Sequence, residues 1–232
     1  MTISRTARLA AVAVAGVLAL AACGSDGGSS ASSSGDANCV SGSLKASGSS
    51  AQKNAMAEWI NGYQSNCSGA TIDYQANGSG AGIQDFINKQ TAFAGSDSAL
   101  KEDDKTAADA RCATGPAIDI PLVGGAIVAA YNVSGVDKLI LSSDVLAGIF
   151  GNTITKWNDP KIAGINPGVT LPDATIAQFH RSDSSGTTDN FTKYLAAQAA
   201  ADWSFSNSKD WKAPGGQGAK GSDGIASAVK ST

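Results

Sequence analysis

The stretch VSGSLKASGSSAQKNAMAEWINGYQSN, residues 40–66, decides the fold. Residues 40–47 alternate weakly, as a short strand does, and the small residues 48–50 then interrupt the pattern. Residues 51–66 carry apolar side chains at spacings of three and four, which predicts an amphipathic helix that a serine of the turn is placed to cap. A strand, a small turn and a helix are the opening of a βα unit.

The same alternation continues to the end of the chain, which predicts an α/β fold with a largely parallel sheet. The long apolar run at 117–133 is expected to be a strand that leaves one domain and enters the next. In chain order, the expected elements are strands at 71–75 and 92–94 with a helix around 83–87 between them, the long strand at 117–133, a strand at 139–141, a helix at 143–150, a loop at 151–172, a strand at 175–179, a helix at 186–200 and a short helix at 225–229.

The N-terminus is typical of export. Two arginines precede an apolar run, residues 9–22, that is too short to span a bilayer, so residues 1–22 are predicted to be a signal peptide. The run ends in LAAC, which resembles the lipobox of bacterial lipoproteins and makes Cys23 the expected lipidation site. The alternative is cleavage nearby with Cys23 discarded. Residues 23–38 are rich in Gly, Ser and Ala, so a flexible linker is expected to tether the folded part outside the membrane.

The charge of the chain argues against nucleic acid as a partner and limits how an anionic ligand could be bound. The formal net charge is -3 with a pI near 5.0. A general nucleic-acid binder needs a basic patch, so nucleic acid is not an expected partner. The field of the whole molecule would not attract an anion either. Any anionic ligand must therefore be held by local dipoles and hydrogen bonds.

The cysteines suit an exported protein. With Cys23 assigned to the lipid, Cys39, Cys67 and Cys112 remain. Because three is an odd number, either one thiol stays free or its partner lies outside this sequence. Metal binding is the rival interpretation, but the spacings are wide and His180 is the single histidine, so neither a metal nor a cofactor is predicted.

Three predicted turns between a strand and a helix share the same chemistry: GSSA at 48–51, NGSG at 77–80 and RSDSSGT at 181–187. In open α/β folds, such turns lie beyond the carboxyl ends of the strands, where ligands bind. The first N–H groups of each helix lack partners within the helix, and serine and threonine hydroxyls add donors. Together the turns predict a site for a tetrahedral oxyanion, although each turn alone is also explained as a helix cap.

Two charged residues refine this prediction. The planar guanidinium of Arg181 can bind two oxygens of an anion, and Asp183 is placed to orient it. The carboxylate of Asp97 can accept a proton from hydrogen phosphate, whereas sulfate has none to give, so Asp97 would select against sulfate. In the alternative interpretation, Asp97 caps a helix in 101–109 and Arg181 makes a surface ion pair.

Several motifs resemble those of the phosphate-binding lipoproteins of phosphate ABC transporters, the PstS family. They run in order from about residue 40 to the end of the chain. The motifs are GSSAQ at 48–52, YQANGSG at 74–80, FAGSD at 93–97, IFGNTITKW at 149–157, NPG at 166–168, RSDSSGT at 181–187 and KGSDGIA at 220–226.

The resemblance implies the site residues and the architecture. The implied phosphate ligands are Ser50, Ala51, Ser79, Asp97, Arg181, Ser185, Gly186 and Thr187, with Asp183 paired to the arginine. Some family members have another residue at the position of Ala51, which matters little if its N–H alone binds. The implied fold is the two-lobed periplasmic-binding-protein fold of type II-like solute-binding proteins, with lobes at 39–128 and 129–232. Family members are longer, so the resemblance also implies that a C-terminal return segment is missing and that the first lobe is incomplete.

The implied function is high-affinity phosphate binding outside the membrane and delivery to the permease subunits of an ABC importer. An enzyme is not expected: a phosphatase would need clustered metal ligands, and no G-x-S-x-G elbow is present. His180, close in sequence to Ser182 and Asp183, is interpreted as a packed side chain. The remaining alternatives are a binding protein for sulfate or molybdate and a surface lipoprotein without a transport role.

Overall fold

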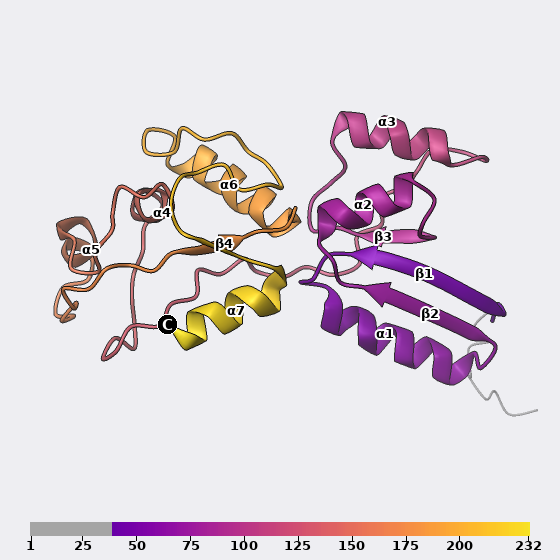
Figure 1. Ribbon diagram of the computed structural model, residues 1–232, viewed down its shortest axis with the longest axis horizontal. Helices are drawn as coiled ribbons and strands as arrows, with labels where there is room; N and C mark the ends of the chain where they lie inside the picture. Colours follow the sequence, from indigo (N-terminus) through magenta and orange to yellow (C-terminus); the bar gives the residue numbers. More distant parts are fainter. Residues whose placement is uncertain (1–38) are drawn as a thin grey trace, which may run out of the picture. The chain divides into compact units, whose positions relative to one another are not determined.

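The first half of the structure is a three-stranded parallel sheet with helices between its strands (Figure 1). The computed structural model describes residues 39–232; the predicted signal peptide, linker and lipidation site Cys23 lie outside the described residues. The sheet has the order β2-β1-β3. Its elements are β1 (Gly42–Gly48), α1 (Lys53–Asn66), β2 (Ala70–Gln75), α2 (Ser79–Ile87) and β3 (Phe93–Gly95).

The order of the strands positions the turns that follow them. Strand β1 pairs in parallel with β2 from Gly42↔Ala70 onward and with β3 up to Gly48↔Gly95. The chain moves one way from β1 to β2 and the other way from β2 to β3, so right-handed crossovers put α1 and α2 on opposite faces. The carboxyl ends of all three strands share one edge, which brings their turns together.

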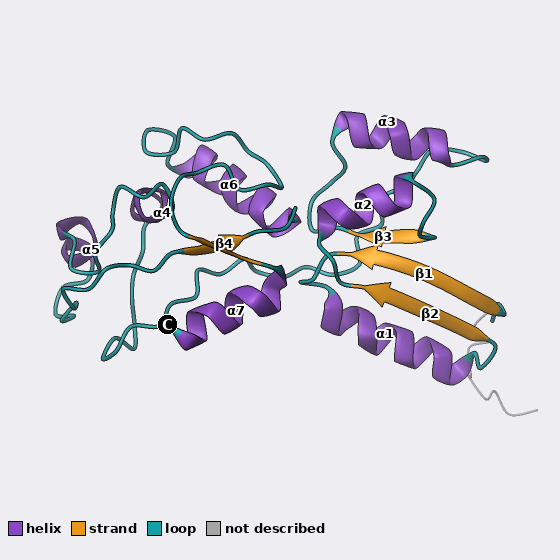
Figure 2. Ribbon diagram, in the orientation of Figure 1, coloured by secondary structure: helices purple, strands orange, loops and turns teal. Residues whose placement is uncertain are grey.

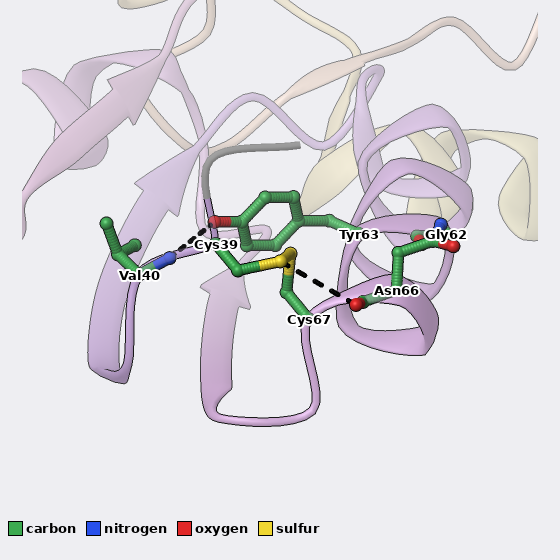
Figure 3. Close-up of a disulfide and its surroundings, with 6 residues drawn as sticks. All are labelled: Cys39, Val40, Gly62, Tyr63, Asn66 and Cys67. Atoms are coloured by element: carbon green, nitrogen blue, oxygen red, sulfur yellow. Dashed lines mark hydrogen bonds between the residues drawn. A yellow bond between two sulfur atoms is a disulfide. The ribbon is translucent and has the colours of Figure 1, made fainter. Parts of the chain in front are cut away.

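A disulfide joins Cys39, just before β1, to Cys67, just after α1 (Figure 3). Next to it, the Val40 N–H donates to the hydroxyl oxygen of Tyr63 at 3.4 Å. Cys112 is a free, half-buried thiol. The structure therefore shows one pair, and the alternative that the partner of the third cysteine lies outside this sequence stays a prediction.

The second half of the chain contains a two-stranded parallel sheet, β4-β5, paired from Phe179↔Gln217 to Arg181↔Ala219. Helix α7 packs against both of its strands. The elements after β3 are α3 (Glu102–Arg111), α4 (Ser143–Phe150), α5 (Pro160–Ile165), β4 (Phe179–Arg181), α6 (Gly186–Gln198), β5 (Gln217–Ala219) and α7 (Gly221–Ser231).

Helix α4 supports two apolar clusters from its two faces. Ala147 packs with Leu195 of α6 and with Trp203, while Val145 packs with Ile162 of α5. Ile162 and Leu195 are both fully buried. Because apolar burial is the main favourable term in folding, these clusters hold α4, α5 and α6 together.

The α/β prediction is confirmed, and most expected elements are present within a few residues. The prediction of a long strand at 117–133 is wrong: the structure has no strand there, and Figure 2 draws this part as loop. Ile118 and Val128 are each 75% exposed. A strand needs a hydrogen-bonding neighbour, and no strand within residues 39–232 pairs with this run. The boundary between the predicted lobes, at 128/129, stays a prediction.

Other corrections are local. The expected strand at 139–141 is absent, because the Ile140 backbone bonds to the Asn166 side chain, at 2.7 Å and 2.8 Å, and not to a neighbouring strand. The strand expected at 175–179 begins at Phe179, whereas Thr175 forms an isolated bridge with Lys156. The expected loop 151–172 contains α5, which Asp159 caps by accepting the Lys161 N–H at 2.9 Å. Strand β5 was not predicted.

The cap predicted for α1 is also wrong. Its N-cap residue is Gln52, which makes no capping hydrogen bond through its side chain. Among the described residues, no helix combines the length and the apolar character needed to cross a membrane.

Candidate functional site

The turn after β1 brings a buried serine to the end of β3. A Cβ atom on Gly48 would lie 2.0 Å from the carbonyl oxygen of Gly95, so only glycine permits this approach. Ser49 is 1% exposed, and its hydroxyl donates to the carboxylate of Asp97. Ser49 is thus the serine of this turn that contacts Asp97.

Asp97 is the point where three segments meet. Its carboxylate accepts hydrogen bonds from Ser49 after β1, from Ser79 Oγ at the start of α2 (3.4 Å) and from Thr187 Oγ1 in α6 (3.3 Å). Its own N–H donates to Ser79 Oγ at 3.3 Å. The alternative that Asp97 caps a helix is wrong, because the N-cap residue of α3 is Lys101.

The start of α6 fits directly against this carboxylate. A Cβ atom on Gly186 would lie 2.8 Å from Ser79 Oγ and 2.9 Å from the Cβ of Asp97, so a larger residue would push the two segments apart. Ser185 is the N-cap residue and accepts the Thr188 N–H at 3.4 Å. The first N–H groups of α6 lack partners within the helix, so they add positive potential beside Asp97.

Arg181, at the end of β4, is 7% exposed and forms a two-point ion pair with Asp183. One bond runs from Arg181 Nε to Asp183 Oδ1 at 2.6 Å, and Arg181 Nη2 donates to Asp183 Oδ2. The side chains are only 6% and 11% exposed, so the alternative of a surface ion pair is wrong. A guanidinium has five N–H groups, and three stay available for an anion.

The Asp183 carboxylate is held in its ionised form. Burial alone would raise the pKa of Asp183, but hydrogen bonds from Arg181 and from the Gly221 N–H, together with the positive charge of Arg181, bring this pKa below its usual value. The Gly221 N–H lies 3.0 Å from Asp183 Oδ1. The pair is therefore tied both to β4 and to the start of α7.

The two predicted ligands after β1 have different surroundings. Ser50 Oγ accepts the Ser222 N–H at 3.0 Å. Ala51 is exposed, and its N–H donates to Ser49 Oγ at 3.1 Å. The structure therefore gathers Ser79, Gly186 and Thr187 around Asp97. It places Ser50 against α7, and Arg181 against Asp183.

Sequence reasoning missed four residues of this site: Ser49, Tyr74, Gly221 and Ser222. Ser49 belongs to the predicted turn 48–51 but is not among the predicted ligands. The Tyr74 hydroxyl donates to the Ser49 carbonyl oxygen at 2.9 Å, and its pKa is raised by burial and by the charge of Asp97, so it stays a donor. The one signal for Gly221 and Ser222 was their membership of the KGSDGIA motif.

His180 has a packing role, as predicted. Its ring stacks on Trp211 with centroids 4.8 Å apart, and burial lowers its pKa. Among residues 39–232, no hydrogen bond joins His180 to Ser182 or Asp183, so a Ser-His-Asp arrangement is not formed there. The described residues also contain no group of three metal-ligating side chains.

The site thus combines hydroxyl donors and the start of α6 around the Asp97 carboxylate with a buried guanidinium that a second carboxylate, Asp183, holds. The donors suit an oxyanion, because each can bind a negatively charged oxygen. The carboxylate needs a donor in return. A ligand with several acceptor oxygens and one proton would satisfy both requirements.

Known proteins are similar to this chain in sequence. The PBP superfamily domain matches residues 32–232. The phosphate-binding protein PstS3 of Mycobacterium bovis is 43% identical over 239 residues, covering 100% of this chain and 64% of that protein. The phosphate-binding protein PstS 2 of Mycobacterium tuberculosis is 42% identical over 244 residues, with the same coverage. The chain thus spans 64% of the length of these relatives.

A solved structure shares the fold. A crystal structure with bound phosphate, of a substrate-binding protein assigned to phosphate ABC transport in Clostridium perfringens, aligns with a TM-score of 0.58. The alignment covers 82% of this chain and 67% of that chain at 21% sequence identity. The match to the superfamily domain extends over most of the chain and over both sheets. The chain therefore belongs to the PBP superfamily.

Proposed function

We propose that the protein binds inorganic phosphate outside the membrane and delivers it to an ABC importer, without catalysing a reaction. The relatives that are 42–43% identical over the whole chain are named phosphate-binding proteins. The observation that carries the proposal is the Asp97 carboxylate, surrounded by three hydroxyl groups from three segments.

The hydroxyl groups explain how this carboxylate would select its ligand. A serine or threonine hydroxyl rotates freely, so the donors on Asp97 can turn to the oxygens of an anion. Hydrogen phosphate would then donate its own proton to the Asp97 carboxylate, in place of these hydroxyl groups. Sulfate has no proton at neutral pH, so it would leave a half-buried carboxylate without a donor and next to a like charge.

The other predicted residues supply donors in this proposal. Arg181 binds through the N–H groups that Asp183 leaves free, and the partial neutralisation by Asp183 keeps the arginine from holding the anion too tightly. The complete set of proposed ligands is Ser50, Ala51, Ser79, Asp97, Arg181, Ser185, Gly186 and Thr187. The two predicted lobes, 39–128 and 129–232, would close around the anion.

Export and delivery complete the proposal. The signal peptide over 1–22, the lipid on Cys23 and the linker over 23–38 would hold the binding domain at the outer surface of the membrane. There the closed, loaded form would meet the permease subunits of the importer.

Calorimetric titration of the purified protein with phosphate and with sulfate near neutral pH tests the function. We expect tight phosphate binding and much weaker sulfate binding. Equal affinity for both anions would favour a general oxyanion-binding protein. Binding of neither anion would favour a surface lipoprotein without a transport role, and either result would reject the proposal.

Asp97→Asn tests the selection mechanism. The amide can donate to a sulfate oxygen, so the preference for phosphate over sulfate should fall at least tenfold, or about 1.4 kcal/mol. Asp85→Asn is a matched control, because Asp85 is also a half-buried aspartate that binds a serine hydroxyl, Ser47 Oγ, at 2.7 Å. An unchanged preference in Asp97→Asn would remove Asp97 from the proposed site.

A further inference from the structure

The start of helix α7 touches two parts of the proposed phosphate site without supplying a proposed ligand. Two successive backbone N–H groups are involved. The Gly221 N–H donates to Asp183 Oδ1 at 3.0 Å, and the Ser222 N–H donates to Ser50 Oγ at 3.0 Å. Ser50 and Ser222 are 172 residues apart in the sequence, so this contact joins the turn after β1 to the last helix.

The contact with Ser222 constrains the hydrogen of the Ser50 hydroxyl. A hydroxyl oxygen has two acceptor positions and one hydrogen, which rotates to suit its surroundings. Because the Ser222 N–H points at Ser50 Oγ, the Ser50 hydrogen cannot point toward that N–H. The hydroxyl of Ser222 lies 3.3 Å from Ser50 Oγ, and either of the two oxygens can be the donor. The bond from the Ser222 N–H therefore leaves the Ser50 hydrogen for another acceptor, which Ser222 Oγ or an anion can be.

The contact with Gly221 acts on the arginine. Asp183 holds Arg181 through two bonds, and the Gly221 N–H fixes the oxygen that receives the bond from Arg181 Nε. Gly221 has a φ of +72°, a left-handed conformation that favours glycine. The same turn therefore fixes both a hydroxyl after β1 and the carboxylate that orients Arg181.

A third contact at this place is weak by comparison. Lys53 Nζ and Asp223 Oδ2 lie 2.7 Å apart, but their side chains are 54% and 76% exposed. Exposed ion pairs contribute little because water and salt screen them. The link between α7 and the site therefore depends on the two backbone N–H groups.

We propose that Gly221 and Ser222 are positioning residues of the phosphate site: their backbone N–H groups orient the Ser50 hydroxyl and the Asp183–Arg181 pair toward the anion. This inference rests on the proposed function. It assigns a role to the KGSDGIA motif, which the set of direct ligands leaves unexplained.

Ser222→Pro tests the role of the N–H group directly. Proline has no N–H and is tolerated in the first turn of a helix. Gly221, which would precede it, is outside the right-handed helical region that proline disfavours in its neighbour. Ser222→Ala is the matched control, because it keeps the N–H and removes only the hydroxyl.

We expect Ser222→Pro to weaken phosphate binding about tenfold, since the net contribution of one hydrogen bond corresponds to roughly that factor in affinity. Ser222→Ala should change phosphate binding by less than about threefold. A Ser50→Ala background separates positioning from a general structural effect. There, Ser222→Pro should cause no further loss, because its target hydroxyl is gone. Wild-type affinity in Ser222→Pro, or an equal loss in both backgrounds, would overturn the inference.

Amide hydrogen exchange covers the case in which Ser222→Pro does not fold. In the wild-type protein, phosphate should slow exchange of the Ser222 amide, and Ser50→Ala should speed this exchange and abolish the effect of phosphate. Exchange that is indifferent to Ser50 and to phosphate would overturn the inference. The wild-type titration separates the two proposals: phosphate binding without these effects rejects only the positioning role, whereas no phosphate binding rejects both.

Discussion

Asp183 shows how a buried charge is kept ionised by its neighbours. Its carboxylate is 11% exposed, and it receives two bonds from Arg181 and one from the Gly221 N–H. The folded-state pKa of Asp183 lies below its unfolded value, so the stability that follows from this shift is complete above the unfolded pKa, about 3.9. It is lost as the pH falls through the lower folded-state pKa.

Asp183→Asn should therefore destabilise the protein most at neutral pH. Loss of the charge leaves Arg181 buried without its counter-ion, and we expect a decrease of about 2 kcal/mol in the free energy of unfolding at pH 7. Urea unfolding from pH 7 down to pH 2 checks this. The difference between wild type and variant should shrink below about pH 3.9, and a difference that is constant across this range would contradict the role of the charge.

Gly186→Ala should weaken phosphate binding by about tenfold or more, roughly 1.4 kcal/mol. The added methyl group would lie under 3 Å from Ser79 Oγ and from the Cβ of Asp97, so the segments that meet at Asp97 would have to separate. Gly164→Ala in α5 is the matched control, since a methyl group there meets no atom within 4 Å. Phosphate titration of both variants decides between a steric effect at the site and a general effect of alanine.

At the scale of the elements, the first βα unit is closed by a covalent bond. The disulfide joins Cys39 to Cys67 at a sequence separation of 28, so it encloses β1 and α1. Met56 is the one buried side chain of α1 in the structure, so this helix is held by few apolar contacts of its own. The disulfide consequently matters more here than it would in a well-buried unit.

Removing the disulfide should destabilise the protein by about 3.6 kcal/mol, the value expected for a closed loop of this length. The double variant Cys39→Ser/Cys67→Ser and the wild type with reductant should shift the urea midpoint alike. Cys112→Ser should leave the midpoint close to that of wild type, because its thiol pairs with no other cysteine of the described residues. A midpoint that does not respond to reductant would show that α1 and β1 are held mainly by packing.

At the scale of the whole molecule, the net charge opposes an anionic ligand. With a formal net charge of -3, long-range attraction does not speed capture, and the site must hold the anion by short-range donors. The buried position of Arg181 and Ser79 agrees with this, since buried groups are screened little by salt.

The association rate of phosphate should therefore stay constant or rise slightly between about 10 mM and 150 mM ionic strength, as added salt screens repulsion. Stopped-flow tryptophan fluorescence can follow it, since the sequence has four tryptophans. A rate that falls steeply with salt would instead indicate steering by a positive surface.

The sequence by itself determined the order of most elements and the three turns that build the site, because a strand, a small turn and an amphipathic helix are local patterns. Helix α4 was predicted with its observed bounds. Asp97 and Arg181 were found because each lies within three residues of the end of a predicted strand. The long apolar run at 117–133 misled, since composition alone cannot show whether a strand has a neighbour to pair with.

Only the tertiary structure decided which groups meet. The contacts of Asp97 with Ser49 and Thr187 span 48 and 90 residues, and that of Ser50 with Ser222 spans 172. The pairing of Cys39 with Cys67 likewise depends on how α1 returns to the start of β1. Local patterns set the geometry of each turn, but the distance between two turns depends on how the sheets and helices pack, which no single stretch of sequence encodes.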